Sequence, residues 1–247
     1  MNTPSVKIGN FLFRHAFPVY NAVYPVFKRR QDKREISIIT RYLKAGDYVL
    51  DIGANIGFYT RILSRLVGPH GRVYSFEPDT VNFRHLQNNC GKLSNVVLHN
   101  KAVGAETGTI RIYTSPMLNV DHRTYPVDDY RSIEEIPCVS PDELFPENQR
   151  VDFIKIDIQG FEVSAFRGMV RLLARNPGIR ILSEFWPHGL AKAGETAADY
   201  LQVFWDAGLQ VYFVADSGFE LITPENLPLY DNPDPSAYMN IFVTRNK

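Results

Sequence analysis

Asp51 and Glu77 are the two acidic residues whose positions indicate chemistry most plainly. Asp51 lies in the stretch Tyr-Val-Leu-Asp-Ile-Gly-Ala-Asn-Ile-Gly-Phe-Tyr-Thr (residues 48–60), and Glu77 follows a second apolar stretch 26 residues later. A carboxylate at the end of a strand attracts a cationic ligand, and a second carboxylate at this spacing accepts hydrogen bonds from the hydroxyls of a ribose. The pair therefore predicts a site for a positively charged nucleoside.

The stretch that contains Asp51 predicts a strand, a turn and the beginning of a helix. Gly53 and Gly57 would let a ligand approach the backbone, whose N–H groups are unpaired at a helix N-terminus. A dinucleotide-binding loop requires Gly-x-Gly-x-x-Gly, but Asn55 stands at the second glycine position and Phe58 at the third. The turn therefore favours S-adenosylmethionine, which carries an ammonium and a sulfonium charge, over a diphosphate.

Three motifs follow one another along the chain. They are Asp-Ile-Gly-Ala-Asn-Ile-Gly-Phe-Tyr-Thr (51–60), Ser-Phe-Glu-Pro-Asp (75–79) and Ile-Lys-Ile-Asp-Ile-Gln-Gly-Phe-Glu (154–162). Together they resemble the FkbM-type S-adenosylmethionine-dependent methyltransferases, and the resemblance covers residues 35–245. It implies S-adenosylmethionine as the cofactor. One departure is Gln159, where the family more often has glutamate, so no acid role is expected at this position.

The expected cofactor-binding residues lie around the first two motifs and after the third predicted strand. The loop Asn100-Lys101-Ala102 follows that strand, and the resemblance implies that it borders the adenine. The alternative for Lys101 is a solvated side chain. The full expected set is Asp51, Gly53, Asn55, Gly57, Tyr59, Glu77, Pro78, Lys101 and Ala102.

Methyl transfer to an alcohol requires a group that accepts the hydroxyl proton, and a neutral histidine or a carboxylate can do so. His122 is the first candidate, because it lies in a polar loop (115–125) that should hang over the cofactor. Asp157 is the second candidate, because it ends the buried strand 151–158. The structural alternatives are a surface or turn histidine and an aspartate that pairs with Lys155.

Residues expected to contact the acceptor lie in the same loop and around the carboxyl end of the fifth predicted strand. They are Asn119, Arg123, Glu184 and His188. Three acids, Asp157, Glu162 and Glu184, are oxygen ligands that could hold magnesium. Nothing in their spacing requires a metal, and none is expected.

The apolar pattern predicts an α/β fold. Strands are expected at 48–52, 72–76, 95–99, 151–158, 179–185, 209–215 and 238–244, with helices between most of them. The resemblance implies a Rossmann-like class I methyltransferase fold. Its sheet has seven mostly parallel strands, an antiparallel last strand and helices on both faces.

Two segments stand apart from this pattern within a single predicted methyltransferase domain (35–247). Residues 104–140 predict an antiparallel excursion from the main sheet, with strands at 109–113 and 133–139. The proline-rich stretch 224–235 predicts a loop over the substrate mouth.

Residues 1–34 form a predicted N-terminal extension. Within it, residues 11–30 combine an aromatic and apolar run with the basic cluster Lys28-Arg29-Arg30. One interpretation is that this segment packs over its own domain as a lid. The other is that it contacts a membrane surface or a partner subunit, and in the second case the protein could be a homo-oligomer. We favour the lid, because Pro18 and Pro25 should interrupt any long amphipathic helix.

Composition excludes several classes of protein. The 247 residues include 27 Lys and Arg against 27 Asp and Glu, so no global charge recruits nucleic acid or an anionic membrane. No apolar run approaches the roughly 18 residues that span a bilayer, and the N-terminus lacks the pattern of a secretory signal. Cys90 and Cys138 are isolated thiols without metal-type spacing. Together these features predict a cytoplasmic protein.

The leading prediction is an S-adenosylmethionine-dependent O-methyltransferase that acts on a hydroxyl of a small acceptor, such as a sugar, a glycan or a polyketide-type natural product. One alternative is a non-catalytic methyltransferase-like binding module whose N-terminus forms an interface. A lesser alternative is a nucleotide-dependent oxidoreductase, because Glu77 could bind the ribose of any adenosine.

Overall fold

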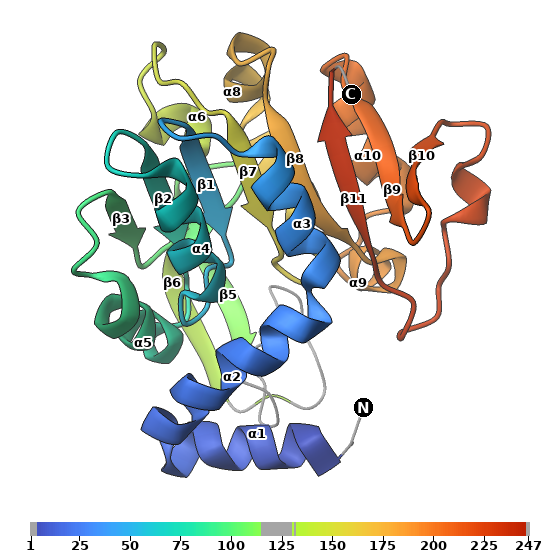
Figure 1. The fold of residues 1–247 in the computed structure, drawn as a ribbon. Helices are drawn as coiled ribbons and strands as arrows, with labels where there is room; N and C mark the ends of the chain where they lie inside the picture. Colours follow the sequence, from blue (N-terminus) through green and yellow to red (C-terminus); the bar gives the residue numbers. More distant parts are fainter. Residues whose placement is uncertain (1–3, 115–129, 131, 246–247) are drawn as a thin grey trace.

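The main sheet contains eight strands in the order β10-β9-β11-β8-β7-β1-β2-β3 (Figure 1). This computed structural model describes residues 4–114, 130 and 132–245, and the strand count refers to those residues. Five strands on one side of the sheet run parallel to their neighbours. They are β1 (Tyr48–Ile52), β2 (Arg72–Phe76), β3 (Val96–His99), β7 (Phe153–Ile156) and β8 (Arg180–Phe185).

The last strand along the chain, β11 (Met239–Thr244), lies between β8 and β9 (Gln210–Ala215) and is antiparallel to both. This confirms the predicted antiparallel last strand. The predicted count of seven is wrong, because β10 (Gly218–Ile222) adds an eighth strand at the edge beside β9. Only Ile222 of β10 is buried, so this strand lacks the apolar run that marks the others.

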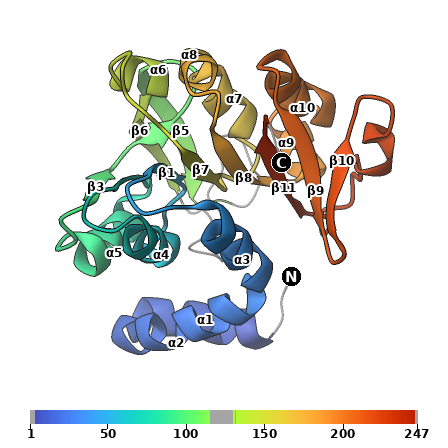
Figure 2. The ribbon, with the colours of Figure 1, turned by 45° about the horizontal axis from the view of Figure 1, so that its top comes forward.

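Helices cover both faces of the sheet, as predicted (Figure 2). Alternate strand residues point to opposite faces, so Val49 packs with α3 (Lys33–Tyr42) and α4 (Phe58–Val67), whereas Leu50 packs on the other side. The other face is covered by α7 (Glu162–Arg167), α8 (Val170–Arg175) and α10 (Ala197–Asp206). Shorter elements are α6 (Pro141–Leu144), α9 (Pro187–Lys192) and the 3₁₀ helix Leu227–Leu229.

A second, three-stranded sheet forms where the excursion was expected. In it, β6 (Ser132–Val139) pairs antiparallel with β5 (Gly108–Thr114) and parallel with β4 (Ala102–Val103). Ile112, Ile136 and Cys138 give this sheet a small core of its own. The predicted loop 115–125 lies outside the described residues.

Two helices of the N-terminal extension, α1 (Pro4–His15) and α2 (Phe17–Gln31), lie together on one side of the molecule (Figures 1 and 2). Their inner side chains pack on the rest of the chain. Phe13 and Tyr20 cluster with Ile56, and the Phe17 ring stacks on His85 of α5 (Thr80–Cys90) at 3.4 Å between centroids. None of the described helices is both long and apolar enough to cross a bilayer.

Pro25 lies inside α2, so the prediction that it interrupts a helix is wrong. Proline removes one backbone hydrogen bond, but packing on the inner face offsets this cost. Tyr24 stacks on Tyr20 at 5.0 Å and meets the edge of Phe58 at 6.1 Å. Pro18 stands in the first turn of α2, where no hydrogen bond is lost.

Candidate active site

A row of polar side chains runs along the carboxyl ends of the central strands, on the face that α3 and α4 cover. The strand register places Asp51 of β1 beside Ser75 of β2 and beside Lys155 of β7. Farther along the sheet, Glu184 of β8 lies opposite Asn240 of β11. Carboxyl ends of parallel strands are where α/β sheets place their ligands. This row is therefore the candidate active site.

Asp51 is fully buried, and one of its carboxylate oxygens is paired. Oδ2 accepts a hydrogen bond of 2.6 Å from the hydroxyl of Thr60, which lies 3.2 Å from that of Ser75. Oδ1 is buried without a hydrogen-bond partner among the described residues. Burial raises the pKa of Asp51, against the opposing effect of the Lys155 ammonium. An unpaired buried carboxylate oxygen is costly unless a cationic or hydrogen-bonding ligand reaches it.

The glycines of the turn serve close packing within the protein. Both have positive φ, +81° at Gly53 and +89° at Gly57. A Cβ at Gly53 would lie 2.1 Å from the Asp157 carbonyl oxygen, and one at Gly57 would lie 2.6 Å from Cys90 Sγ. In the structure these glycines make room for the loop after β7 and for α5, and their predicted contact with a ligand stays a prediction.

Glu77 holds the turn after β1 through hydrogen bonds from the backbone. Its two oxygens accept the N–H of Asn55 at 2.7 Å and the N–H of Asp79 at 3.0 Å. Asn55 takes a positive φ of +50°, which aims its N–H at this carboxylate. Burial raises the pKa of Glu77 to about 8, although both N–H groups act in the opposite direction. The Asn82 side chain is a third hydrogen-bond partner, and a carboxylate with about four acceptor positions could still accept one ligand hydroxyl.

The segment after β3 differs from the predicted loop. Ala102 is buried and begins β4, while Lys101 is half-buried in the bend before it. Asn100, which was not predicted as a site residue, donates to the carbonyl oxygens of Glu77 and Pro78, both at 2.9 Å. The sequence signal that could have indicated this hydrogen-bonding role is the position of the amide side chain, directly after a strand at the carboxyl edge of the sheet.

These residues fit S-adenosylmethionine in their chemistry. The unpaired Asp51 Oδ1 could accept a hydrogen bond from an ammonium group, and Glu77 could accept from ribose hydroxyls. No group of three His, Cys, Asp or Glu residues suited to a metal ion occurs in the described part of the chain. Glu162 instead caps its own turn, because it accepts the N–H groups of Ile158 and Gly160.

A charged pocket of about 210 Å³ opens beside this row. Its lining comes from the sheet edge and from the N-terminal helices: Lys28, Gln31, Asp32, Glu35, Tyr59, Lys155, Ile156, Asp157, Leu182, Glu184, Tyr238 and Asn240. Four carboxyl groups and two ammonium groups therefore face one small space. Such a lining suits a polar ligand with several hydrogen-bonding groups.

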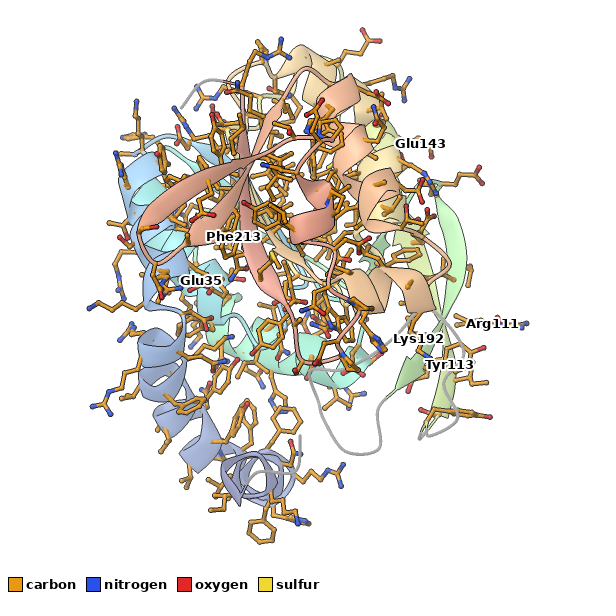
Figure 3. All side chains as sticks on the ribbon, turned by 90° about the vertical axis from the view of Figure 1, so that its right-hand side faces the viewer. Glu35, Arg111, Tyr113, Glu143, Lys192 and Phe213 are labelled. Atoms are coloured by element: carbon orange, nitrogen blue, oxygen red, sulfur yellow. The ribbon has the colours of Figure 1, made fainter. Side chains whose placement is uncertain are left out.

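Residues of α2, of α3 and of the junction between them complete this pocket. The buried Asp32 accepts a 2.6 Å hydrogen bond from the Tyr59 hydroxyl and forms an ion pair of 2.8 Å with Lys28. Glu35 extends from α3 towards the sheet (Figure 3) and accepts a hydrogen bond from Asn240. Sequence reasoning missed Asp32 and Glu35, because only the fold of the extension brings them to the sheet edge.

Tyr59, predicted to bind the cofactor, lies in the wall of the pocket. Its hydroxyl donates a hydrogen bond to Asp32, and the Lys155 ammonium lies 4.8 Å from the centroid of its ring. Burial raises the pKa of its hydroxyl far above the usual value, and the nearby Asp32 adds to this effect. Tyr59 therefore acts as a hydrogen-bond donor that fixes the N-terminal helices to the sheet edge.

Asp157 and Glu184 face one another across Gln159. The Gln159 amide nitrogen lies 3.1 Å from Asp157 Oδ1 and 3.1 Å from Glu184 Oε2, and Lys155 Nζ lies 3.6 Å from Asp157 Oδ2. Gln159 adopts a positive φ of +57°, so the backbone is strained at this bridge. The structure thus gives Gln159 a bridging role that the sequence left open.

The two carboxyl groups have opposite pKa shifts. Burial raises the pKa of Asp157, but the Lys155 and Lys28 ammonium groups and the Gln159 amide outweigh this effect and hold it below its usual value. Burial, together with the negative charges of Asp157 and Glu162, raises the pKa of Glu184 well above its usual value. One carboxyl group is therefore held ionised beside one that retains its proton more readily.

The remaining predicted residues are not brought into this cluster. His122, Asn119 and Arg123 lie outside the described residues. His188 of α9 is half-buried, and its Nδ1 lies 3.1 Å from the Pro233 carbonyl oxygen, so it contacts the end of the proline-rich loop. Trp186 donates to the Pro235 carbonyl at 3.1 Å in the same region.

Comparisons with known proteins bear on the family and the fold of this chain. A curated relative, "Methyltransferase 1" of Beauveria bassiana (strain ARSEF 2860), is 23% identical over 145 residues, which cover 49% of this chain and only 58% of that protein. A solved structure from Clostridium thermocellum, described as a "putative rRNA-methylase", has a TM-score of 0.50 at 11% identity and covers 86% of this chain and 93% of that chain.

A second solved structure, a SAM-dependent O-methyltransferase from Thermotoga maritima, has a TM-score of 0.46 at 15% identity and covers 85% of this chain and 64% of that chain. The likeness to the Clostridium thermocellum structure concerns the fold, which is that of a class I methyltransferase. The profile described as "Methyltransferase FkbM domain" matches residues 51–211, which is more than half of the chain and includes Asp51, Glu77 and Asp157. The chain belongs to the FkbM methyltransferase family.

Proposed function

We propose that this protein is an S-adenosylmethionine-dependent O-methyltransferase that acts on a small hydroxylated acceptor. The observation that carries the proposal is the juxtaposition of two sites at one sheet edge. The turn between Asp51 and Glu77 suits a cationic nucleoside, and the charged pocket beside it suits a polar acceptor. Family membership supports the cofactor.

The bound cofactor would supply an electrophilic methyl group on its sulfonium. The protein would hold its ammonium group at Asp51 and its ribose hydroxyls at Glu77. The pocket would orient the acceptor hydroxyl for in-line attack on the methyl carbon. This alignment lowers the activation barrier of methyl transfer. When the acceptor oxygen gains the methyl group, its proton must leave, and a carboxylate within reach of the hydroxyl can accept it.

Asp157 is the residue of the described chain best suited to accept this proton. Its low pKa keeps it ionised at neutral pH, and it lines the pocket. Lys155 and Gln159 fix the orientation of its two oxygens. His122 stays the other predicted base, and the two assignments give different pH profiles, since a histidine titrates near neutral pH and Asp157 well below it.

Cofactor binding is tested by calorimetric titration with S-adenosylhomocysteine. Asp51→Asn and Glu77→Gln should each weaken binding at least about tenfold, because each removes a carboxyl group that would hydrogen-bond to the ligand. Glu143→Gln is the matched control, because this side chain is exposed on α6 at a distance from the sheet edge (Figure 3). Unchanged affinity in both site variants would refute the cofactor assignment.

The reaction is tested by transfer of a labelled methyl group to a panel of sugars and polyketide-type alcohols, with amine analogues of the same size alongside. Asp157→Asn should lower turnover by about a hundredfold or more while S-adenosylhomocysteine still binds. A large loss in His122→Ala together with an unaffected Asp157→Asn would transfer the base role to His122. Labelling of the amines alone would refute O-methylation.

A further inference from the structure

The outer sides of α1 and α2 expose large apolar side chains. More than half of the surface of each of these residues is accessible to solvent: Ile8, Phe11, Val19, Val23, Val26 and Phe27. On α2, positions 19, 23, 26 and 27 recur at helical spacing and form an exposed stripe, which lies beside the row of the more buried Tyr20 and Tyr24. We call these six residues the outer apolar face. Exposed apolar residues gathered in this way mark interaction surfaces.

Basic residues accompany the outer apolar face, and acidic residues are missing from the sequence around it. The first 31 residues contain Lys7, Arg14, Lys28, Arg29 and Arg30 and no Asp or Glu, whereas the other 216 residues contain 22 Lys and Arg against 27 Asp and Glu. Lys7, Arg29 and Arg30 are exposed. Lys28 is paired with Asp32 in the pocket. The basic residues of this segment outside that ion pair are Lys7, Arg14, Arg29 and Arg30, and the balanced net charge of the chain conceals a cationic N-terminal segment.

This charge distribution decides between two occupants of the face. A symmetric dimer formed through the same face would bring two cationic segments together, and like charges in contact are unfavourable. An anionic bilayer surface attracts the basic side chains, and its headgroup boundary accepts Phe, Val and Ile side chains. A helix pair with exposed apolar residues and basic neighbours matches this second environment.

We propose that the outer apolar face of α1 and α2 docks on an anionic membrane surface, with the helices lying in the plane of the interface. The same α2 that carries this face places Lys28 and Gln31 in the wall of the charged pocket on its inner side. Docking therefore sets the pocket beside the bilayer. The proposal does not depend on the reaction that the pocket performs.

The test is co-flotation of the full-length protein with vesicles, without cofactor or acceptor. Vesicles of phosphatidylcholine mixed with phosphatidylglycerol should bind the protein at least about tenfold more than vesicles of phosphatidylcholine alone, and added salt should weaken the binding. Phe27→Glu and Val23→Glu should each reduce binding at least about tenfold. Leu229→Glu is the matched control, because Leu229 is 81% exposed but lies in the 3₁₀ helix after β10.

A second pair of variants tests the contribution of the basic side chains to membrane binding. Arg29→Gln combined with Arg30→Gln should reduce binding to the anionic vesicles, whereas Lys192→Gln should not. Both substitutions alter the last turn of a helix, and Lys192 lies on a different side of the molecule from α1 and α2 (Figure 3). All variants should keep the melting temperature of the parent, since the substituted side chains are exposed.

Three results would overturn the proposal. The first is a failure of the anionic vesicles to bind the protein, and the second is binding that the Val23 and Phe27 variants leave unchanged. The third is a dimer in light scattering that Phe27→Glu converts to a monomer, which would assign the face to a second copy of the chain. Cofactor affinity measured on the same samples shows separately whether the methyltransferase assignment stands.

Discussion

Single residues at the turn after β1 define the candidate site, and the sequence predicted them in part. Asp51 and Glu77 could be placed from the sequence because Asp51 stands near the end of one apolar strand and Glu77 follows another, so that both lie at the carboxyl edge of the sheet. The partners of their oxygens could not be predicted. Pairing of Glu77 with the Asn55 N–H depends on a positive φ at a non-glycine residue, and no sequence pattern specifies this.

Gly53 offers a direct test of this turn. Gly53→Ala should destabilise the protein by at least about 2 kcal/mol, because the added Cβ would meet the Asp157 carbonyl and the backbone has φ +81°. Urea denaturation measures the change. Gly178→Ala is the control, since its Cβ would meet no heavy atom within 4 Å and its φ is not positive. Equal stability of the two variants would show that the turn is not as close-packed as described.

At the scale of elements, the strands with long apolar runs were more predictable than the total number of strands. Long apolar strands such as β1 and β8 are marked by their composition, and the antiparallel direction of the last strand followed from the family resemblance. The edge strand β10 was missed because its residues are mostly exposed. The path of α2 and α3 across the sheet edge was also beyond prediction, because packing overrides the helix-breaking tendency of Pro25.

The junction of α2 and α3 with the sheet is held by Tyr59. Tyr59→Phe should destabilise this junction by about 1–2 kcal/mol, since Asp32 would lose one of its two charged or polar partners while it stays buried. Limited proteolysis should then cleave between residues 28 and 36 faster than in the parent protein. The control is Tyr48→Phe, because the Tyr48 hydroxyl makes no hydrogen bond within the described residues. Equal cleavage rates in both variants would contradict the role given to Tyr59.

For the whole molecule, buried carboxyl groups make stability depend on pH. Burial raises the pKa of Glu162 to about 7 and that of Glu77 to about 8, both above the values expected in the unfolded chain. The folded state then binds protons more tightly than the unfolded state. The stability that this contributes is complete below about pH 4.5 and is lost as pH rises through the folded pKa values.

The melting temperature should therefore fall between pH 5 and pH 8, and Glu162→Gln should reduce this fall. A pKa near 7 in the folded state corresponds to at most about 3 kcal/mol for this residue, or several degrees for a protein of this size. Scanning calorimetry at several pH values measures the effect. Glu143→Gln, at an exposed position, should leave the slope unchanged. A slope in Glu162→Gln as steep as that of the parent would contradict the raised pKa.

The pairing of β1 with β7 has a consequence for how the chain folds. Val49 lies beside Phe153 in the central parallel pair, so about a hundred residues must be synthesised before β1 meets its second neighbour. Contacts between such distant residues slow folding, and an unpaired edge is prone to aggregation in the meantime. When the first half of the chain has emerged from the ribosome, β1 can pair with β2 and α4 can pack on both strands. The edge of β1 that later pairs with β7 still lacks its hydrogen-bond partners at that stage. Expression at lower temperature, or with chaperones that shield strand edges, should raise the yield of folded protein.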